Sequence, residues 1–310
     1  MDASRGRSVM KITILGSGTP APSLKRACSG YMIEVGDDVI IMDHGPDAHR
    51  RLIESGKRAT DVTHAFFTHL HYDHFLDYGR LVSARWDMGA GKVDELGVYG
   101  PPPLARISEQ LFGDDGVYGP DLDARTGHRL SLDIYELRGG ALPRHKPTPN
   151  VTEISPGDVV DGGGWRVVVG EASHVQPYLQ CHVYRLESTA GTICYTGDSG
   201  GITNSVVDTA AGCDVLIHMA HFESGTEPSA AYRAGCGGHM DVAEVARRAS
   251  VKTLVMSHVL EHIDRPGTRE RLINEAAEVF KGEIIWAEDL MQIIVGGDGQ
   301  RTRAQTSSEW

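Results

Sequence analysis

Short apolar runs that end at glycine or polar residues divide this chain into alternating strands and helices. The runs typical of strands are 11–15, 31–35, 39–42, 63–67, 96–99, 165–170, 182–187, 192–195, 215–217, 253–256, 283–286 and 291–295. The segments that predict helices are 46–55, 76–86, 100–112, 242–249 and 268–280. Polar side chains able to bind a metal follow at least five strands. This pattern predicts an α/β protein with two packed sheets and a site along one edge.

The segment 113–150 is rich in glycine, aspartate and proline, and it predicts an irregular insertion with one strand-like run at 132–137. A loop of this length either shapes a binding site or is a solvated insertion without function, and the sequence leaves both open. Residues 1–9 are expected to be a disordered leader and 297–310 a flexible tail. One domain is expected between them, at 10–296.

Charge and composition exclude some partners. The chain of 310 residues carries 42 acidic and 30 basic residues, a formal net charge of −12, which argues against gripping nucleic acid mainly through phosphates. There is no secretory signal and no apolar run of the roughly 20 residues that a membrane helix needs, so no membrane partner is expected. The five cysteines are scattered and contain no C-x-x-C pair, which favours a reducing, cytoplasmic location.

The stretch 68–74 reads Thr-His-Leu-His-Tyr-Asp-His and contains the pattern H-x-H-x-D-H. A lone histidine is usually a satisfied surface or core imidazole, but three histidines and one aspartate within six residues need another explanation. His69 and His71 are two apart and can face one metal, while Asp73 and His74 can face a second. Neutral imidazole and carboxylate suit zinc, with manganese or iron as alternatives.

The chain resembles the metallo-β-lactamase superfamily, and within it the branch of RNase Z and arylsulfatase-like proteins. The resemblance spans roughly residues 11–295, and five stretches carry it: LGSGTPAPSLKRACSG, IIMDHG, THLHYDH, YTGDSG and GHMDVAEVARRASVKTLVMSH. It implies a four-layer αββα sandwich, a metal-dependent hydrolase activity and two divalent metal ions, with zinc expected. It also implies a homodimer.

Ligand positions follow from the resemblance residue by residue. His69, His71 and His174 would hold one metal, and Asp73, His74 and His258 the other, with Asp198 bridging. The flanks of His174 match the family pattern only through Val183-Tyr184-Arg185 downstream. Asp43 and His44 would support the ligands from behind.

Two further positions carry expectations about chemistry. Hydrolysis would use a metal-bound hydroxide, with Asp73 orienting or deprotonating the water. His239 matches the histidine that the RNase Z-like branch uses towards the phosphate and leaving group, so it is expected to act as general acid or transition-state stabiliser; a local capping role at a helix start is the alternative. Met219 stands where RNase Z proteins have a glutamate partner for that histidine.

The substrate expected from the sequence is a small molecule: a sulfate or phosphate ester, a lactone or an activated aryl ether. RNase Z proteins carry a tRNA-gripping arm, in many of them between the stretches that correspond to Arg185 and Asp198, and only twelve residues separate these two here. His221, Phe222 and Tyr178 are candidates for the substrate pocket, with structural burial an equal alternative for His221. The alternative function is an RNase Z-like phosphodiesterase or endoribonuclease that lacks the arm.

Overall fold

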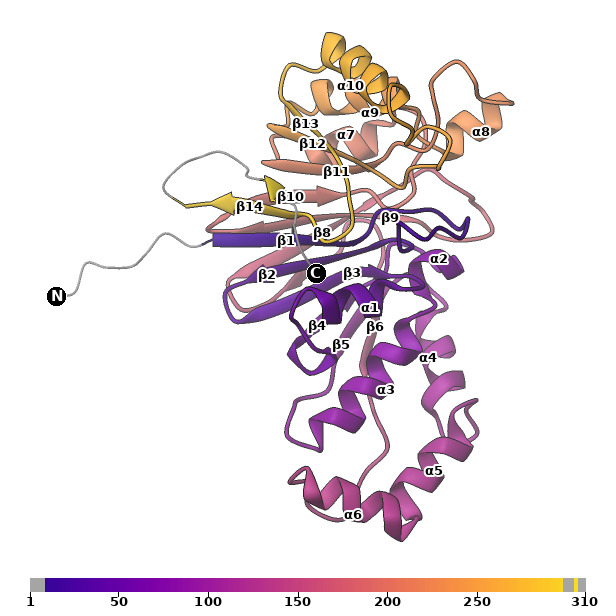
Figure 1. The fold of residues 1–310 in the computed structure, drawn as a ribbon, viewed down its shortest axis with the longest axis vertical. Helices are drawn as coiled ribbons and strands as arrows, with labels where there is room; N and C mark the ends of the chain where they lie inside the picture. Colours follow the sequence, from indigo (N-terminus) through magenta and orange to yellow (C-terminus); the bar gives the residue numbers. More distant parts are fainter. Residues whose placement is uncertain (1–8, 298–303, 306–310) are drawn as a thin grey trace, which may run out of the picture.

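The computed structural model describes residues 9–297 and 304–305, and these form two β-sheets that pack face to face (Figure 1). The first sheet has the strand order β15 (Ala304–Gln305), β14 (Gln292–Gly296), β1 (Val9–Gly16), β2 (Gly30–Val35), β3 (Asp38–His44), β4 (His64–Phe66), β5 (Gly97–Gly100) and β6 (Asn150–Glu153). The second has the order β13 (Glu283–Trp286), β12 (Thr253–Ser257), β11 (Val215–Met219), β10 (Gly191–Tyr195), β9 (His182–Ser188), β8 (Trp165–Glu171) and β7 (Val159–Asp161).

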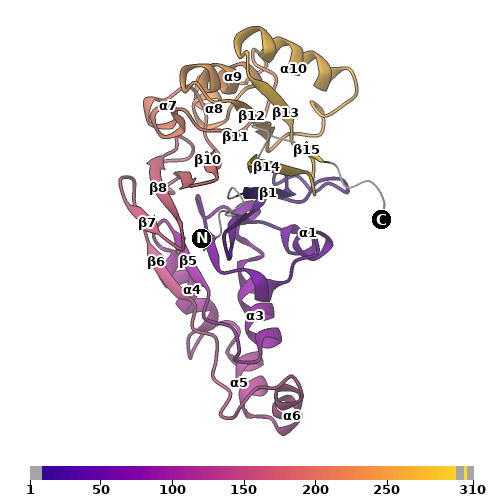
Figure 2. The same cartoon turned by 90° about the vertical axis from the view of Figure 1, so that its left-hand side faces the viewer.

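Helices cover the outer face of each sheet, which confirms the predicted αββα sandwich (Figure 2). The helices on the first sheet are α1 (Ala48–Glu54), α3 (Tyr78–Gly89) and α4 (Leu104–Phe112), with the 3-10 turn η1 (Ala59–Asp61) beside α1 and α3. The helices on the second sheet are α7 (Asn204–Ala210), α9 (His239–Arg248) and α10 (Thr268–Val279). The remaining helices are α2 (Tyr72–Phe75), α5 (Gly119–Gly127), α6 (Arg129–Leu137) and α8 (Ala230–Gly235).

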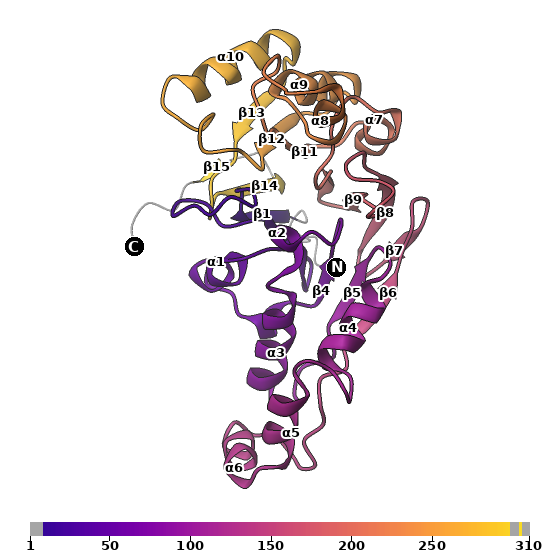
Figure 3. The same ribbon diagram turned by 90° about the vertical axis from the view of Figure 1, so that its right-hand side faces the viewer.

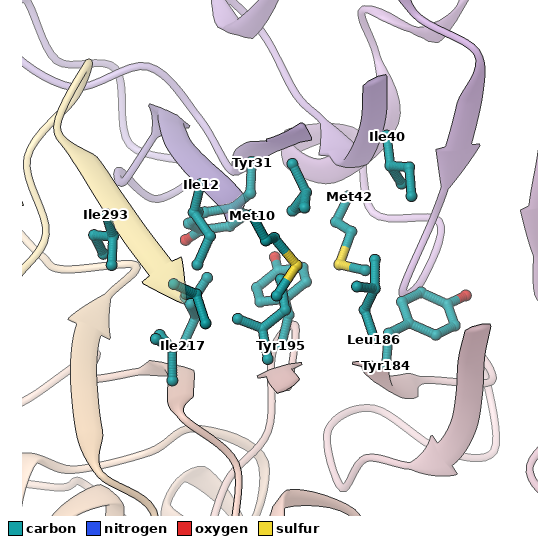
Figure 4. Packing of buried hydrophobic residues seen from close by; sticks show 14 of the residues in the cluster. Met10, Ile12, Tyr31, Ile40, Met42, Tyr184, Leu186, Tyr195, Ile217 and Ile293 are labelled. Atoms are coloured by element: carbon teal, nitrogen blue, oxygen red, sulfur yellow. The ribbon is translucent and has the colours of Figure 1, made fainter. Parts of the chain in front are cut away.

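The largest apolar cluster lies between the two sheets (Figure 4). Alternate residues of β1, such as Met10 and Ile12, point from the first sheet towards Leu186 and Ile217 of the second. Because successive side chains of a strand point to opposite faces, the residues between them face the helices. The sequence alternation therefore builds three apolar layers, and it leaves the strand ends free for polar side chains.

Parallel pairing brings the carboxyl ends of several strands to one edge. β3 runs parallel to β4, and β10, β11 and β12 run parallel to one another. The segments that leave these ends contain the H-x-H-x-D-H loop after β4, Asp198 after β10 and His258 after β12. β8 pairs antiparallel with β9, and β9 with β10, so His174 after β8 leaves the second sheet in the same direction. The topology thus places the predicted ligands at one edge.

The strand expected at 132–137 is wrong, because this run belongs to helix α6. Leu130, Ile134 and Leu137 recur with helical spacing, whereas the short run alone reads as alternation. Helix α5 also lies in the segment predicted to be irregular, and Figure 3 shows both helices projecting from the body of the sandwich. The strands β6 and β7 and the helices α7 and α8 were not predicted.

The predicted leader and tail lie mostly outside the described residues. Val9 already belongs to β1, and Ala304–Gln305 pairs with β14. The expectation of a single domain at 10–296 stays a prediction. All five cysteines lie within the described part of the chain and are free thiols there. Among the helices that the structure describes, none combines the length and apolarity needed to cross a membrane.

Candidate metal centre

The H-x-H-x-D-H loop connects β4 to the single-turn helix α2. His69 and His71 lie in the loop, and His71 caps α2 with extended backbone dihedrals (φ −65°, ψ 148°). Asp73 and His74 lie within α2 itself, and both are buried. The backbone changes from extended to helical at Tyr72, and the His74 ring still lies close to His69, with ring centroids 4.2 Å apart. The short loop supplies ligand atoms to two groups.

The first group consists of His69, His71, His174 and Asp198, whose candidate ligand atoms all lie within 4.8 Å of one another. His71 Nδ1 lies 3.0 Å from His69 Nε2 and 3.3 Å from His174 Nε2. His174 Nε2 lies 3.7 Å from Asp198 Oδ2. Three imidazole nitrogens and one carboxylate oxygen thus converge from segments that are far apart in sequence.

The second group consists of Asp73, His74, Asp198 and His258, again within 4.8 Å of one another. His258 Nε2 lies 3.2 Å from Asp73 Oδ2 and 3.4 Å from Asp198 Oδ2. His74 Nε2 lies 3.2 Å from Asp198 Oδ1 and 3.4 Å from Asp73 Oδ2. Asp198 belongs to both groups, as expected for a carboxylate that bridges two ions.

The donor atoms fit divalent metal ions. His74 Nε2 and Asp198 Oδ1 are buried without a hydrogen-bond partner in the structure, although such atoms are normally satisfied. Two groups of imidazole and carboxylate donors therefore point to a dinuclear site. Ligands of this kind suit zinc but also manganese or iron.

The electrostatics of the two groups differ. Burial lowers the pKa of His69 well below its usual value and also lowers the pKa of His71, which favours the neutral imidazole that binds metal. Burial opposes charge on His74 as well, but the carboxylates of Asp198 and Asp43 raise the pKa of His74 well above its usual value. The carboxylates around His74 therefore favour a positive charge in the second group, as a bound cation would supply.

Asp43 supports the loop from behind, as the sequence predicts. Its side chain is fully buried and accepts hydrogen bonds from the Thr68 amide and hydroxyl, each at 2.7 Å. The same carboxylate lies 2.7 Å from His74 Nδ1 and accepts the Tyr195 hydroxyl at 2.7 Å. With Nδ1 donating to Asp43, His74 presents Nε2 to the second group. One buried carboxylate therefore orients a ligand and fixes the start of the loop.

Two other ligand candidates also have partners for the second ring nitrogen. His174 Nδ1 lies 2.6 Å from the carbonyl oxygen of Gly235, so it donates to that oxygen and leaves Nε2 for the first group. His258 Nδ1 lies 3.2 Å from His221 Nδ1. His221 is thus in contact with a ligand candidate, and its membership in a substrate pocket stays a prediction.

Three other positions named from the sequence, His44, Phe222 and Tyr178, have no direct contact with a ligand candidate among the contacts described here. His44 does not support a ligand directly, because its Nε2 lies 3.3 Å from His49 Nδ1. Phe222 is buried and packs on Tyr232, with ring centroids 5.3 Å apart. Tyr178 is 90% exposed on the loop after His174. The membership of Phe222 and Tyr178 in a substrate pocket stays a prediction.

His239 begins α9, and both of its ring nitrogens are engaged. The Ser224 amide donates to His239 Nδ1 at 3.0 Å, and His239 Nε2 lies 2.9 Å from Glu275 Oε2. The predicted role as general acid or transition-state stabiliser stays a prediction, since proton transfer to a substrate would require one of these contacts to break.

Sequence reasoning missed three polar side chains that organise the site. Thr68 and Tyr195 bind Asp43, and Glu275 binds His239. A hydroxyl at the last residue of a strand, directly before the Thr-Gly-Asp sequence that contains Asp198, is a signal that could have identified Tyr195. Glu275 lies in the middle of α10 and carries no such signal.

Comparison with known proteins agrees with this geometry. A family model described as the metallo-beta-lactamase superfamily matches residues 25–258, which include all seven ligand candidates. The chain belongs to the metallo-beta-lactamase superfamily. It is a metal-dependent hydrolase of that superfamily, with paired histidine and aspartate groups at the edge of the sandwich.

Within the metallo-beta-lactamase superfamily, the chain is similar to proteins named ribonuclease Z. The one from Mycobacterium sp. (strain KMS) is 28% identical over 293 residues, which cover 93% of this chain and 96% of the relative. The crystal structure of the metallo-beta-lactamase fold protein YhfI from Bacillus subtilis matches with a TM-score of 0.69 at 21% identity, covering 92% of this chain and 99% of that one. Human tRNase Z, short form, matches with a TM-score of 0.64 at 21% identity, covering 91% and 98%.

Proposed function

We propose that this chain is a dinuclear-metal phosphodiesterase, similar to ribonuclease Z but without the tRNA-gripping arm. The observation that carries the proposal is the pair of donor groups that share Asp198. A relative named ribonuclease Z aligns over nearly its whole length, at 28% identity, and this similarity favours a phosphodiester over other esters.

The ligand candidates and Asp73 can each be given a role in phosphodiester hydrolysis. Two bound divalent ions, which we expect to be zinc, would lower the pKa of a water and neutralise charge on a phosphate oxygen. His69, His71 and His174 would hold one ion, with Asp73, His74 and His258 at the other and Asp198 between them. Asp73 is proposed to orient the attacking water and to accept its proton, since its carboxylate lies beside the shared Asp198 group.

A cavity of about 430 Å³ begins at Val259, one residue beyond the ligand candidate His258, and none of the seven ligand candidates lines it. One wall includes Val259, the residue after His258, and the other includes residues 18–19 and 21–26. The Tyr72 hydroxyl binds the carbonyl of Pro20, so that wall is tied to the metal loop. The lining contains the basic residues Lys25 and Arg265, which suit phosphate, and also the acidic residues Glu261 and Asp264.

A small substrate is favoured over folded tRNA by two features. β9 and β10 are joined by a tight turn at 189–190, which leaves no room for an inserted arm there. The net charge of −12 also disfavours a long phosphate-binding surface. We therefore propose short or small phosphodiesters, such as dinucleotides and aryl phosphodiesters, as the substrate class.

A second candidate is the hydrolase for other small esters that the sequence predicts, acting on sulfate esters, lactones or aryl ethers. The same tight turn and acidic charge favour it, because neither feature is specific for phosphorus. Only the substrate itself distinguishes the two candidates.

One substrate panel tests the proposal. The zinc-loaded protein is offered bis(p-nitrophenyl) phosphate, a dinucleotide, pre-tRNA, an aryl sulfate, a lactone and a nitroaryl ether. We expect the two small phosphodiesters to give the highest kcat/KM. Preference for the sulfate, lactone or ether would support the second candidate, whereas efficient pre-tRNA cleavage would contradict the size limit.

Metal analysis of the purified protein accompanies this panel. We expect close to two ions per chain, and zinc as the native metal. The predicted homodimer and cytoplasmic location are proposals as well, and mass measurement in solution tests the first.

A further inference from the structure

His221 connects the candidate metal centre to a segment outside it. Its Nδ1 faces Nδ1 of His258, whose Nε2 belongs to the second ligand group. Histidine ligands usually donate the second ring N–H to a partner that fixes the ring orientation. His221 Nδ1 lies at that place here, and it also lies 3.3 Å from the carbonyl oxygen of His258, so His221 contacts both the ring and the backbone of this ligand candidate.

The segment 221–224 is held along the start of α9. The His221 amide donates to the Gly237 carbonyl at 2.7 Å, and the His239 amide donates to the Phe222 carbonyl at 3.2 Å. The Ser224 side chain accepts the Met240 amide at 3.0 Å. The backbone of the segment is therefore hydrogen-bonded to the N-terminus of α9, and His239 takes part in this pairing.

A chain of ionic hydrogen bonds then ties His239 to α10. His239 Nε2 lies 2.9 Å from Glu275, and Glu275 accepts Arg271 at 2.9 Å. Arg271 also donates to Glu223 at 2.8 Å, which closes the network back onto the segment 221–224. Hydrogen bonds from Arg271 and His239 lower the pKa of Glu275. Glu275 is thus a carboxylate acceptor for the His239 ring.

These contacts determine which ring nitrogen of neutral His239 carries the proton. The Ser224 amide requires a lone pair on Nδ1, so the proton of the neutral ring is on Nε2 and points at Glu275. Because His239 is only 2% exposed, its ring cannot exchange the Glu275 contact for bulk water without moving. Loss of Glu275 would leave a buried N–H unpaired, which is costly.

We propose that Glu275 is a positioning residue: through His239 it fixes the segment 221–224 and thereby keeps His221 against the metal ligand candidate His258. This proposal rests on the proposed function in taking His258 as a ligand of the catalytic metal. It assigns His239 a role in holding the segment, and it connects α10 to the metal centre through His239 and His221.

The test compares Glu275→Ala, Glu275→Gln and Glu278→Ala in the zinc-loaded full chain. Glu278 is an exposed glutamate on the same helix and serves as the matched control. Gln retains one oxygen acceptor for His239 but not the charge that binds Arg271, so its effect should be intermediate. The readouts are amide exchange at Ser224 and Met240, zinc release to EDTA, and kcat and KM for bis(p-nitrophenyl) phosphate.

For Glu275→Ala we expect faster exchange at both amides and a roughly 10-fold change in zinc release or kcat, the lower end of the range for partners behind a metal ligand. KM should stay within about twofold, because the substrate-facing residues remain, and a change in geometry at the metal acts mainly on turnover. Glu278→Ala should match the wild type in all readouts.

Unchanged amide exchange in Glu275→Ala, or an equal loss in Glu278→Ala, would overturn the proposal. The double variant with His239→Ala gives a second test, since residues that act as one unit are non-additive. If Glu275→Ala accelerates exchange at both amides but leaves zinc release and kcat unchanged, the segment does not act on His258 and the positioning role is wrong. If the wild type cleaves no phosphodiester but the amide and zinc readouts change as expected, the proposed function fails and the positioning role stands.

Discussion

The metal-bearing edge and the distal arm, residues 113–146, differ in how their polar side chains are used. At the edge, buried carboxylates such as Asp43 and Asp198 each bind several groups from distant segments. In the arm, the guanidinium of Arg144 lies between two rings, 4.0 Å from the centroid of Trp86 and 4.9 Å from that of Tyr135. The edge is organised for ligand geometry, whereas the arm is organised for its own stability.

Salt bridges also stabilise the arm. Asp87 of α3 lies 2.6 Å from Arg144 and 2.8 Å from Arg138, and the Trp86 indole donates to the His145 carbonyl at 2.7 Å. These contacts attach α5 and α6 to the end of α3, away from α10 in Figure 1. Trp86 of α3 therefore packs against the arm. At the edge, imidazole and carboxylate atoms of four residues lie within 4.8 Å of one another, whereas in the arm a guanidinium is paired with Asp87 and stacked on aromatic rings.

Substitution of the shared carboxylate should give the largest effect. Asp198→Ala removes the only residue that belongs to both donor groups. We expect a loss of activity of roughly 10³-fold or more, comparable to removal of a group that stabilises transition-state charge. Metal analysis should show fewer than two ions per chain. Asp208→Ala, on the exposed side of α7, is the control; full metal and turnover in Asp198→Ala would refute the dinuclear centre.

Asp43→Asn should give the next largest effect. Asparagine matches the size of aspartate and tolerates the left-handed backbone at this position (φ 57°), so the change isolates the carboxylate. Its amide nitrogen must face one of the donors that Asp43 now accepts, and we expect an approximately 10- to 100-fold loss in metal affinity or activity. Zinc titration and kcat/KM measure this. Asp37→Asn in the exposed hairpin turn is the control, and equal effects of the two would argue against a supporting role for Asp43.

The edge could be predicted from the sequence because its chemistry restricts both residue type and position. The motif at 68–74 needs imidazoles and a carboxylate at fixed spacing, and the strands that precede each ligand are clear apolar runs. The sequence could not reveal the partners of His239, since Glu275 comes from a helix with ordinary amphipathic spacing. Hydrogen bonds between helices depend on packing angles that no local pattern records.

The arm could not be predicted for a related reason. The run 132–137 fits both a two-residue and a 3.6-residue period, and glycine and proline around it favoured a loop. In the folded chain Tyr135 packs against Arg144, a residue that lies beyond the helix and beyond a glycine pair, and the side chain of His128 caps the start of α6. Neither contact is visible in the six residues of the run.

Substitution of Arg144 tests how the arm is stabilised. Arg144→Ala removes the guanidinium between two rings and leaves Asp87 with one partner fewer, and we expect the arm to lose about 2–3 kcal/mol of local stability. Arg144→Lys keeps the charge but not the planar stack, so it should lose part of this. Amide exchange in α5 and α6 should accelerate, while turnover of bis(p-nitrophenyl) phosphate stays within about twofold. Arg106→Ala on the exposed face of α4 is the control. A large fall in turnover would show that the arm contributes to the site, contrary to the difference between the two regions.

Leu137 should give the smallest effect. It is 87% exposed and lies on one stripe of α6 with Leu130 and Ile134, whereas Tyr135 on the same helix is buried. We expect Leu137→Gln to change the free energy of unfolding by less than about 0.5 kcal/mol, as exposed substitutions usually do. Tyr135→Ala should cost about 3 kcal/mol, since it removes a large buried ring. Thermal unfolding and light scattering measure both variants. If Leu137→Gln instead lowers the melting temperature or the molecular mass in solution, the stripe is covered by another molecule, and the arm, rather than the edge, would be where the predicted homodimer forms.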